Sequence, residues 1–389
     1  MFENKPIFVE PKYVGRPNIG DRAVFIERIN DILDSRWLTN HGKYVKEFED
    51  RLAEFVGAKH AVVMTNGTVA IEVLTRALGM TGEVIVPSAT FVATAHALQW
   101  QGITPVFCDI DSRTHNIDPG QVEELITPRT TGIIGVHLWG RPCDIQALEH
   151  ISLRHNLKLV FDSSHALGCS YKGDMIGGFG IAETFSFHAT KVVNSCEGGA
   201  LVTNDNELAR QARLMTNFGF RGYDKVDYIG INGKMNEMSA AMGLTSLEAF
   251  DAFVDRNRAN YHVYRDRISQ IPGLQMLSYN ETEKNNFHYI VVEVDESITG
   301  ISRDHIIDIL HKENILARRY FYPGCHRMEP YRSYFPHANL LLPRTEWVLN
   351  RVLVLPTGTA ITETDIHKIC DLLVLIVTHG PEISRRLRD

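Results

Sequence analysis

Residues 183–205 read ETFSFHATKVVNSCEGGALVTND, and this stretch decides the fold. A short apolar strand ends near Ser186, a turn carries Lys191, and a glycine pair leads into a second apolar strand. Strands that are apolar throughout are buried on both faces, which predicts an α/β protein with a mostly parallel sheet flanked by helices. Similar apolar runs recur upstream between helical patterns: AVVM (61–64), EVIVP (83–87), PVFCDI (105–110), GIIGVHL (132–138) and KLVFD (158–162).

The helical patterns indicate two domains. Residues 43–56 place Val45, Phe48, Leu52 and Phe55 at helical spacing, and Gly57 follows as a stop signal. After about residue 208 the chain is mainly helical, and it then gives strand-like and helical segments at 287–294, 304–315 and 352–357. We therefore predict a large domain over 1–250 and a smaller C-terminal α+β domain over 251–389.

Composition excludes several classes of protein. The chain has 389 residues, 44% hydrophobic and 22% charged, with a net charge of −7 and no basic run, so a nucleic-acid partner is not expected. Its six cysteines form no CxxC pair, which indicates reduced thiols and no metal site. The sequence shows no signal-peptide pattern and no apolar run of membrane-spanning length, so we expect a cytoplasmic protein without a membrane partner.

Two residues on strand ends indicate the chemistry. Lys191 follows one apolar strand, and Asp162, 29 residues earlier, ends another. A lysine that forms an imine, together with a buried carboxylate that keeps a pyridine nitrogen protonated, is what pyridoxal 5′-phosphate requires of its protein. Asp162 could instead cap a helix. In a parallel sheet, ligands lie beyond the carboxyl ends of the strands, so residues 65–68, 87–91, 162–165 and 186–191 should converge.

The other candidates each have a simpler alternative. Backbone N–H groups of Gly67 and Thr68 could bind a phosphate at a helix N-terminus, although Asn-Gly is also a common turn. Phe91 could stack on a cofactor ring or pack in the core. Ser186 could donate to the phosphate or be an ordinary hydroxyl at a strand end. His165 could reach the ring hydroxyl of the cofactor or simply bond a backbone carbonyl.

Motifs along nearly the whole chain make the resemblance to a family specific. The sequence resembles the DegT/DnrJ/EryC1/StrS family of nucleotide-sugar aminotransferases, which have the aspartate aminotransferase-like fold type I and use pyridoxal phosphate. The resemblance rests on WLTNHGKYVKEFEDRLAEFVGAKHAV, NGTVAIEVL, VPSATFVATAHA, VHLWGRPCDI, FDSSHALGC, FSFHATKVVNSCEGGALVTND, NGKMNEMSAAMG and RRYFYPGCHRMEPY.

This resemblance implies a role for each candidate. Lys191 attaches the cofactor and Asp162 pairs with its pyridine nitrogen. The remaining cofactor contacts implied are Phe91 on the ring, His165 near the ring oxygen, and Gly67, Thr68 and Ser186 around the phosphate. Asn236 is implied to reach the phosphate bound by the other subunit of a homodimer. Tyr320, Tyr322 and His326 match the segment that lines the sugar site.

The resemblance also implies a reaction. We expect an aminotransferase that moves the amino group of L-glutamate to a nucleotide-linked keto-deoxysugar, with dTDP-4-keto-6-deoxyglucose and amination at C4 as the first choice. Amination at C3 is the alternative within this class. A pyridoxal phosphate-dependent sugar dehydratase is a second alternative, but members of that branch carry His where this chain keeps Lys191. A binding protein without turnover is a third, which intact Lys191 and Asp162 disfavour.

Overall fold

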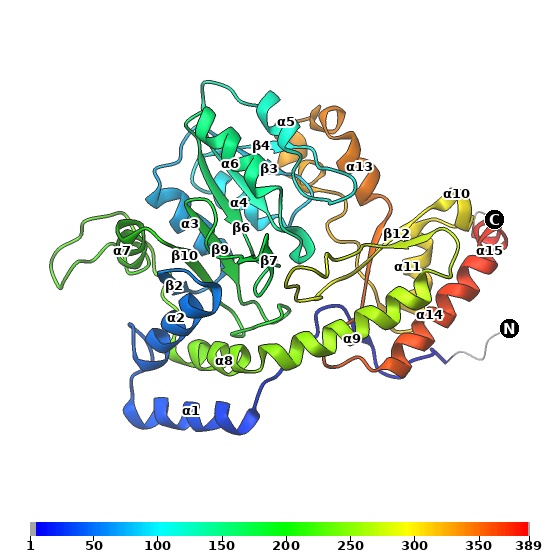
Figure 1. The fold of residues 1–389 in the computed structure, drawn as a ribbon, viewed down its shortest axis with the longest axis horizontal. Helices are drawn as coiled ribbons and strands as arrows, with labels where there is room; N and C mark the ends of the chain where they lie inside the picture. Colours follow the sequence, from blue (N-terminus) through cyan, green and yellow to red (C-terminus); the bar gives the residue numbers. More distant parts are fainter. Residues whose placement is uncertain (1–4, 388–389) are drawn as a thin grey trace.

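The computed structural model of the protein describes residues 5–387. Its centre is a seven-stranded sheet with the order β2-β10-β9-β6-β5-β3-β4 (Figure 1). Within this sheet only β10 runs against the other strands, so the mostly parallel α/β sheet predicted from the apolar runs is confirmed. The strands are β2 (His60–Met64), β3 (Glu83–Pro87), β4 (Thr104–Cys108), β5 (Thr130–Val136), β6 (Lys158–Asp162), β9 (Ala182–Ser186) and β10 (Gly199–Thr203).

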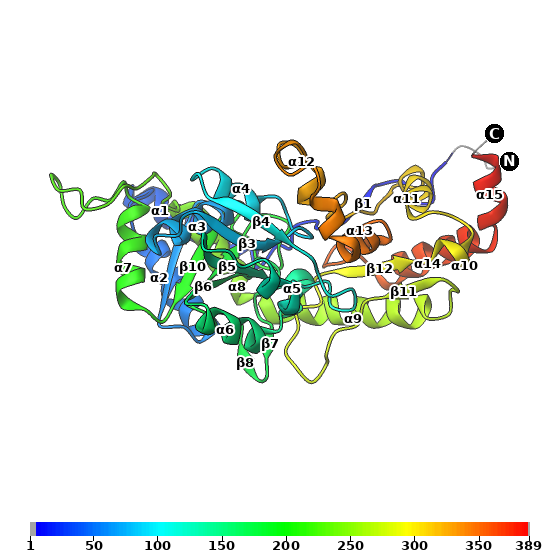
Figure 2. The ribbon, with the colours of Figure 1, turned by 90° about the horizontal axis from the view of Figure 1, so that it is seen from above.

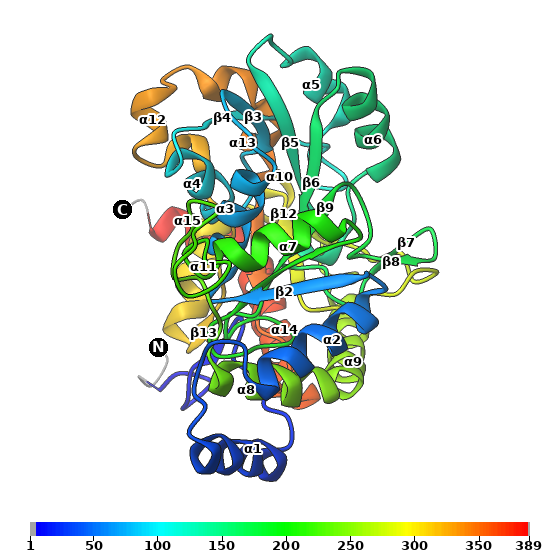
Figure 3. The same ribbon diagram turned by 90° about the vertical axis from the view of Figure 1, so that its left-hand side faces the viewer.

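Helices cover both faces of the sheet. Both faces of β2 are apolar and therefore need to be covered. Ala61 and Val63 belong to one hydrophobic core, and Val62 and Met64 belong to another on the opposite face. In Figure 3, α2 and α8 lie below β2 with α1 outermost, while α3 and α7 lie above it. The helices around this sheet are α1 (Arg22–Ser35), α2 (Lys43–Val56), α3 (Gly67–Ala77), α4 (Ala93–Gln99), α5 (Pro119–Glu124), α6 (Ile145–Arg154), α7 (Asn206–Met215) and α8 (Glu237–Glu248).

Helix α2 spans the predicted residues 43–56. Its buried residues include Val45, Phe48 and Leu52, and it ends where Gly57 adopts the left-handed conformation at φ +70°. Glycine adopts the left-handed conformation at little steric cost, which explains why α2 ends at this position.

The C-terminal part is the smaller α+β unit that the sequence indicated. A three-stranded antiparallel sheet, β11-β12-β14, packs with α9, α11 and α14. Helix α9 follows α8 after a single junction residue, Ala249, and the two run beneath both parts (Figure 1). The elements are α9 (Phe250–Ile268), β11 (Leu274–Met276), β12 (Ile290–Val294), α10 (Glu296–Thr299), α11 (Arg303–Lys312), α12 (Tyr331–Tyr334), α13 (Pro343–Leu349), β14 (Val352–Leu355), α14 (Glu363–Thr378) and α15 (Gly380–Arg386). The division at residue 250 stays a proposal.

Residues 12–15, called the strap below, contact both parts of the protein. Strand β1 (Lys12–Tyr13) pairs in parallel with β13 (Ile315–Leu316), so the start of the chain lies against its C-terminal part (Figure 2). The remaining short elements are η1 (Leu138–Gly140), β7 (Ser170–Tyr171), β8 (Asp174–Met175), η2 (Cys325–Arg327) and η3 (Ala338–Leu341).

Residues 5–387 contain neither a helix of the length and apolarity needed to cross a membrane nor a group of three or more His, Cys, Asp or Glu side chains that could hold a metal ion.

Candidate active site

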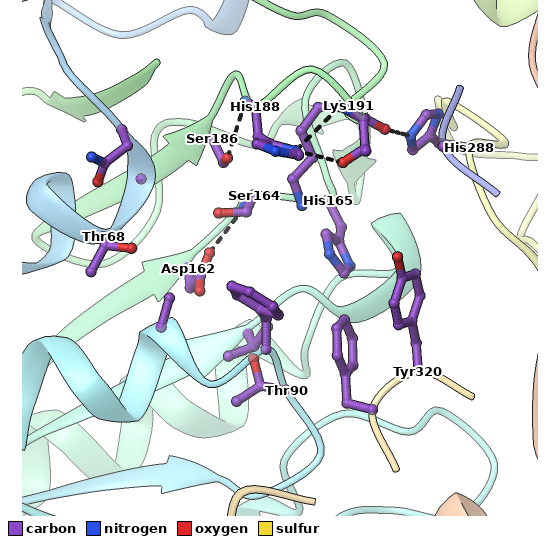
Figure 4. A pocket seen from close by; sticks show the side chains of 18 of the residues that line it. Thr68, Thr90, Asp162, Ser164, His165, Ser186, His188, Lys191, His288 and Tyr320 are labelled. Atoms are coloured by element: carbon purple, nitrogen blue, oxygen red, sulfur yellow. Dashed lines mark hydrogen bonds between the residues drawn. The ribbon is translucent and has the colours of Figure 1, made fainter. Parts of the chain in front are cut away.

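A cleft of about 710 Å³ opens at the carboxyl ends of β6 and β9, beside the N-terminus of α3 (Figure 4). The four segments expected to converge all contribute to its wall. Eight of the predicted site residues line it: Gly67, Thr68, Phe91, Asp162, His165, Ser186, Lys191 and Tyr320.

Asp162 is the last residue of β6 and is 6% exposed. Its Oδ2 accepts a hydrogen bond from the Thr94 hydroxyl at 2.8 Å, and its Oδ1 accepts one from the Ser164 N–H at 3.1 Å. Both partners are neutral, so a buried carboxylate faces the cleft and would be stabilised by a cationic ligand. The next element along the chain is β7 and not a helix, so the helix-cap interpretation of Asp162 is wrong.

Lys191 lies in the turn after β9 and is half-buried. Burial lowers the pKa of its amine to about 8, and the opposing charge of Asp162 limits this fall. A lysine with a lowered pKa carries more of the neutral amine that attacks an aldehyde.

His165 is 8% exposed and lies beside Lys191 (Figure 4). Its Nδ1 accepts a hydrogen bond from the backbone N–H of Trp139 at 3.2 Å. The ring therefore bonds a backbone amide and not the carbonyl considered as an alternative. Burial, together with the charges of Lys191 and His288, holds the pKa of His165 well below its usual value. The neutral ring then carries its proton on Nε2.

The N-terminus of α3 forms another part of the cleft. Asn66 caps this helix by accepting the N–H of Val69 at 2.9 Å, and Gly67 and Thr68 begin its first turn at the cleft. A Cβ on Gly67 would lie 3.0 Å from the Cβ of Ser186, so the glycine lets the helix end approach β9 closely. Such a helix N-terminus favours a phosphate.

Phe91 is 59% exposed, and its ring centroid lies 6.2 Å from that of Phe321. The interpretation of Phe91 as a core residue is therefore wrong, because most of its surface is open at the cleft.

Three predicted residues do not line the cleft of their own chain. Asn236 is exposed and caps α8 through a 2.9 Å bond from the N–H of Ser239. His326 is 2% exposed, and its ring nitrogens bond the Ser88 hydroxyl at 2.7 Å and Glu346 at 2.6 Å. The ring of Tyr322 lies beneath the guanidinium groups of Arg303 and Arg319. Their roles toward cofactor or sugar stay predictions.

Several cleft residues were not singled out from the sequence, although four of them lie in the segments that were expected to converge. Most carry a single polar side chain next to a strand end or a turn, a signal too common to single them out. They include Thr90, Ser164, His188, Thr190, His288, Tyr289 and Arg318.

The fold and the cleft define the class of protein. A low-pKa lysine, a buried carboxylate and a helix N-terminus around one cleft, on a mostly parallel sheet, are the arrangement of a pyridoxal phosphate-dependent enzyme. A family model matches residues 20–374, and the chain belongs to the DegT/DnrJ/EryC1/StrS aminotransferase family.

Relatives and solved structures agree with this family. The chain is 38% identical to the dTDP-4-amino-4,6-dideoxy-D-glucose transaminase of Shigella dysenteriae, over 96% of this chain and 100% of that protein. It is 34% identical to the Escherichia coli protein of the same name, over 93% and 97%. The structure of DesI in the presence of its TDP-sugar product has a TM-score of 0.95 at 50% identity, covering 99% of this chain and 97% of that one. Helicobacter pylori PseC, an aminotransferase of pseudoaminic acid biosynthesis, has a TM-score of 0.87 at 30% identity, covering 95% and 99%.

The protein is thus an aminotransferase with pyridoxal 5′-phosphate as its cofactor and small molecules as its substrates. The cleft fits this cofactor, since it offers an amine, a buried carboxylate that accepts hydrogen bonds from two neutral donors, and a helix N-terminus. When bound, the cofactor supplies an electron sink for the bonds at the reacting carbon.

Proposed function

We propose that the protein moves the amino group of L-glutamate to C4 of a nucleotide-linked 4-keto-6-deoxysugar, with dTDP-4-keto-6-deoxyglucose as the first choice. The observation that carries this proposal is the similarity to DesI, at 50% identity over almost the whole chain, since the DesI structure was determined with its TDP-sugar product. The two relatives named as dTDP-4-amino-4,6-dideoxy-D-glucose transaminases support the same carbon and nucleotide.

In this proposal each residue has a defined role toward the cofactor. Lys191 would attach the cofactor through its amine, and the amine, once released, would take the proton from the α-carbon of glutamate and in the second half-reaction deliver a proton to the sugar carbon. The carboxylate of Asp162 holds the proton of the pyridine nitrogen in place. His165 donates its Nε2–H to the ring oxygen, and Phe91 covers one face of the ring.

The phosphate end of the cleft is assigned to Gly67, Thr68 and Ser186. The first two present N–H groups of α3, and the third presents a hydroxyl from the end of β9. Backbone and hydroxyl donors bind phosphate without requiring a further cation.

We also propose a homodimer, in which Asn236 of the partner subunit completes the phosphate site. Asn236 does not line its own cleft, and its exposed side chain can contact a second copy. The loop between α7 and α8 extends away from the body of the protein (Figures 1 and 2) and carries exposed apolar side chains. Such exposed patches often mark interaction sites. The exposed large apolar residues of this loop are Phe218, Phe220, Tyr223, Val226, Ile229 and Ile231.

The sugar nucleotide is assigned to the wall that carries Tyr320, with Tyr322 and His326 from the same segment as secondary candidates. Tyr320 lines the cleft, where its hydroxyl can bond a sugar or phosphate oxygen. The guanidinium of Arg318 stacks on the Tyr320 ring at 5.3 Å and offers a positive charge to the diphosphate. The cytoplasmic location stays a prediction.

The test separates the two half-reactions. Glutamate alone should remove the visible absorbance of the lysine-bound cofactor, and a 4-keto-6-deoxysugar nucleotide should restore it while gaining the amine, identified at C4 by NMR of the product. Lys191→Ala is the control without turnover. Restoration by a 3-keto isomer alone would favour C3 amination, water loss without net amination would indicate a dehydratase, and restoration only by a simple keto acid would overturn the sugar substrate.

A further inference from the structure

His288 connects the C-terminal part of the protein to the turn that carries Lys191. It precedes β12, lines the cleft and is 8% exposed. Its Nε2 lies 2.8 Å from the backbone carbonyl oxygen of Thr190, the residue directly before Lys191 (Figure 4). A carbonyl only accepts hydrogen bonds, so Nε2 carries the proton and donates it.

The same short segment also holds the turn that carries His165. Asn286 is fully buried, and its Nδ2 donates to the carbonyl oxygens of His165 and Leu167 at 2.8 and 3.0 Å. Its Oδ1 accepts the N–H of His288 at 3.2 Å. Residues 286–288 thus bond two loops of the seven-stranded sheet, one with Lys191 and one with His165.

Thr190 also packs against the N-terminal strap. Gly15, in the strap after β1, approaches so closely that a Cβ there would lie 2.9 Å from the Cβ of Thr190. Gly15 also has a φ of +73°, which an L side chain rarely adopts. The residue before Lys191 is therefore in close contact with the strap and hydrogen-bonded to His288.

The ring of His288 is suited to a fixed contact and not to proton transfer. Burial, together with the charge of Lys191, lowers its pKa to about 4, and the bond to Thr190 limits this fall. The ring stays neutral near pH 7, and its tautomer is set by the Thr190 carbonyl. Its Nδ1 is buried and has no hydrogen-bond partner within residues 5–387.

We propose that His288 is a positioning residue for Lys191, which acts by holding the Thr190 carbonyl and thereby keeps the amine of Lys191 in its desolvated place facing Asp162 and His165. This inference rests on the proposed role of Lys191. Loss of the bond should free the turn, admit water and bring the pKa of Lys191 back toward its ordinary value, because burial is the largest cause of its lowering.

A pair of variants separates the bond from the bulk of the ring. In His288→Gln, the amide nitrogen can replace Nε2 as donor to Thr190. In His288→Phe, the ring and its apolar contacts remain but the donor is lost. His311→Phe is the matched control, since the Nε2 of His311 bonds the carbonyl of Ala317 at the same 2.8 Å distance without lining the cleft.

The measurement is the pH midpoint of Lys191 acetylation in the cofactor-free full chain, followed by mass spectrometry of its peptide. We expect the parent protein, His288→Gln and His311→Phe to share one pH midpoint of acetylation. In His288→Phe this midpoint should rise by about one pH unit. The affinity for pyridoxal phosphate should fall about tenfold in His288→Phe alone. The other titratable groups that line the cleft are unchanged in these variants: Asp162, His165, His188, Glu197, Tyr289, Arg318 and Tyr320.

An unshifted midpoint in His288→Phe, or an equal shift in His288→Gln, would overturn the proposal and leave His288 with a structural role only. If His288→Phe does not fold, His288→Asn replaces it, because its shorter amide cannot reach Thr190. Borohydride trapping of the cofactor in the parent protein separates this inference from the assignment of the site. Trapping at another lysine would refute the role of Lys191, whereas trapping at Lys191 with an unshifted midpoint refutes only the role of His288.

Discussion

Thr94, in helix α4, donates a hydrogen bond of 2.8 Å to the carboxylate of Asp162 at the end of β6. This bond joins two elements that are separated by β4, α5, β5, η1 and α6 in the chain, and it holds one oxygen of a buried acid in a set direction. A carboxylate with two neutral donors is held in one orientation, which is what a protonated ring nitrogen needs from its partner.

Asp162→Asn should preserve this geometry but remove the charge. We expect weaker binding of pyridoxal phosphate and a fall of about 10²- to 10⁴-fold in both half-reactions, because an unprotonated pyridine is a poor electron sink. Thr94→Val is the matched control, since it removes one donor and leaves the charge, and its loss should be near tenfold. Stopped-flow absorbance with glutamate measures both. Near-normal turnover in Asp162→Asn would refute the assigned role.

Lys191 gives a prediction about stability and pH. Its pKa is lowered to about 8 from an ordinary 10.5 in the folded chain. Between these values the unfolded chain binds a proton that the folded chain does not, so the free energy of unfolding gains from rising pH in this window. Below pH 8 the amine of Lys191 is charged and desolvated in the folded chain, and this lowers the free energy of unfolding.

Lys191→Met removes the destabilising effect of the buried, charged amine. In the absence of cofactor, we expect the variant to be more stable than the parent at pH 7, and the difference to shrink as the pH rises from 8 toward 10.5. Urea unfolding of both proteins over this pH range measures the difference. A gap that stays constant with pH would show that the amine is not destabilised by burial.

The proposed shared site can be tested by mixing inactive subunits. Lys191→Ala and Asn236→Ala homodimers should each be inactive or severely impaired, and a heterodimer should regain one site that has both residues intact. Activity should return after subunit exchange, verified by native mass spectrometry with two tags. Mixing two Lys191→Ala preparations is the control, and absent recovery after verified exchange argues against a contribution from Asn236 of the partner subunit.

Tyr320 and His326 should behave differently, although they lie in the same segment. Tyr320→Phe removes a hydroxyl from the cleft wall, so the sugar half-reaction should slow about tenfold while the glutamate half changes little. His326→Ala leaves Ser88 and Glu346 without their buried partner. We expect it to cost about 1–3 kcal/mol of stability. Thermal unfolding and the two half-reactions distinguish these outcomes, and a selective sugar defect in a stable His326→Ala protein would favour the secondary assignment of His326 to the sugar over this structural role.

The sequence predicted those parts of the protein whose signals are local. Continuous apolar runs identified the strands of the main sheet, and the helical spacing of Val45, Phe48 and Leu52 with a terminal glycine located α2. Asp162 and Lys191 stood out because Asp162 ends one apolar strand and Lys191 lies in the turn that follows another. Their convergence follows from the sheet, since the carboxyl ends of parallel strands lie along one edge.

The environment of other residues depends on contacts far along the chain, which no local pattern contains. The ring of His326 forms a hydrogen bond with Ser88, which lies 238 residues away in the chain. The resemblance to a sugar-binding segment therefore did not predict that His326 is buried. Phe91 reads as a core residue from its type, yet its ring is open at the cleft. His288 carries no signal beyond one polar side chain before a strand, and its bond to Thr190 spans 98 residues.

The pairing of β1 with β13 has a consequence for biosynthesis of the chain. Val14 and Gly15 leave the ribosome long before Arg318, Tyr320 and Phe321, yet all five residues line the same cleft. Domains generally fold from the N-terminus during synthesis, but this strap has no partner strand until Ile315 and Leu316 have emerged. The main sheet can therefore assemble early, while a nascent chain halted before residue 315 would carry Lys191 and Asp162 in a cleft that still lacks two of its walls.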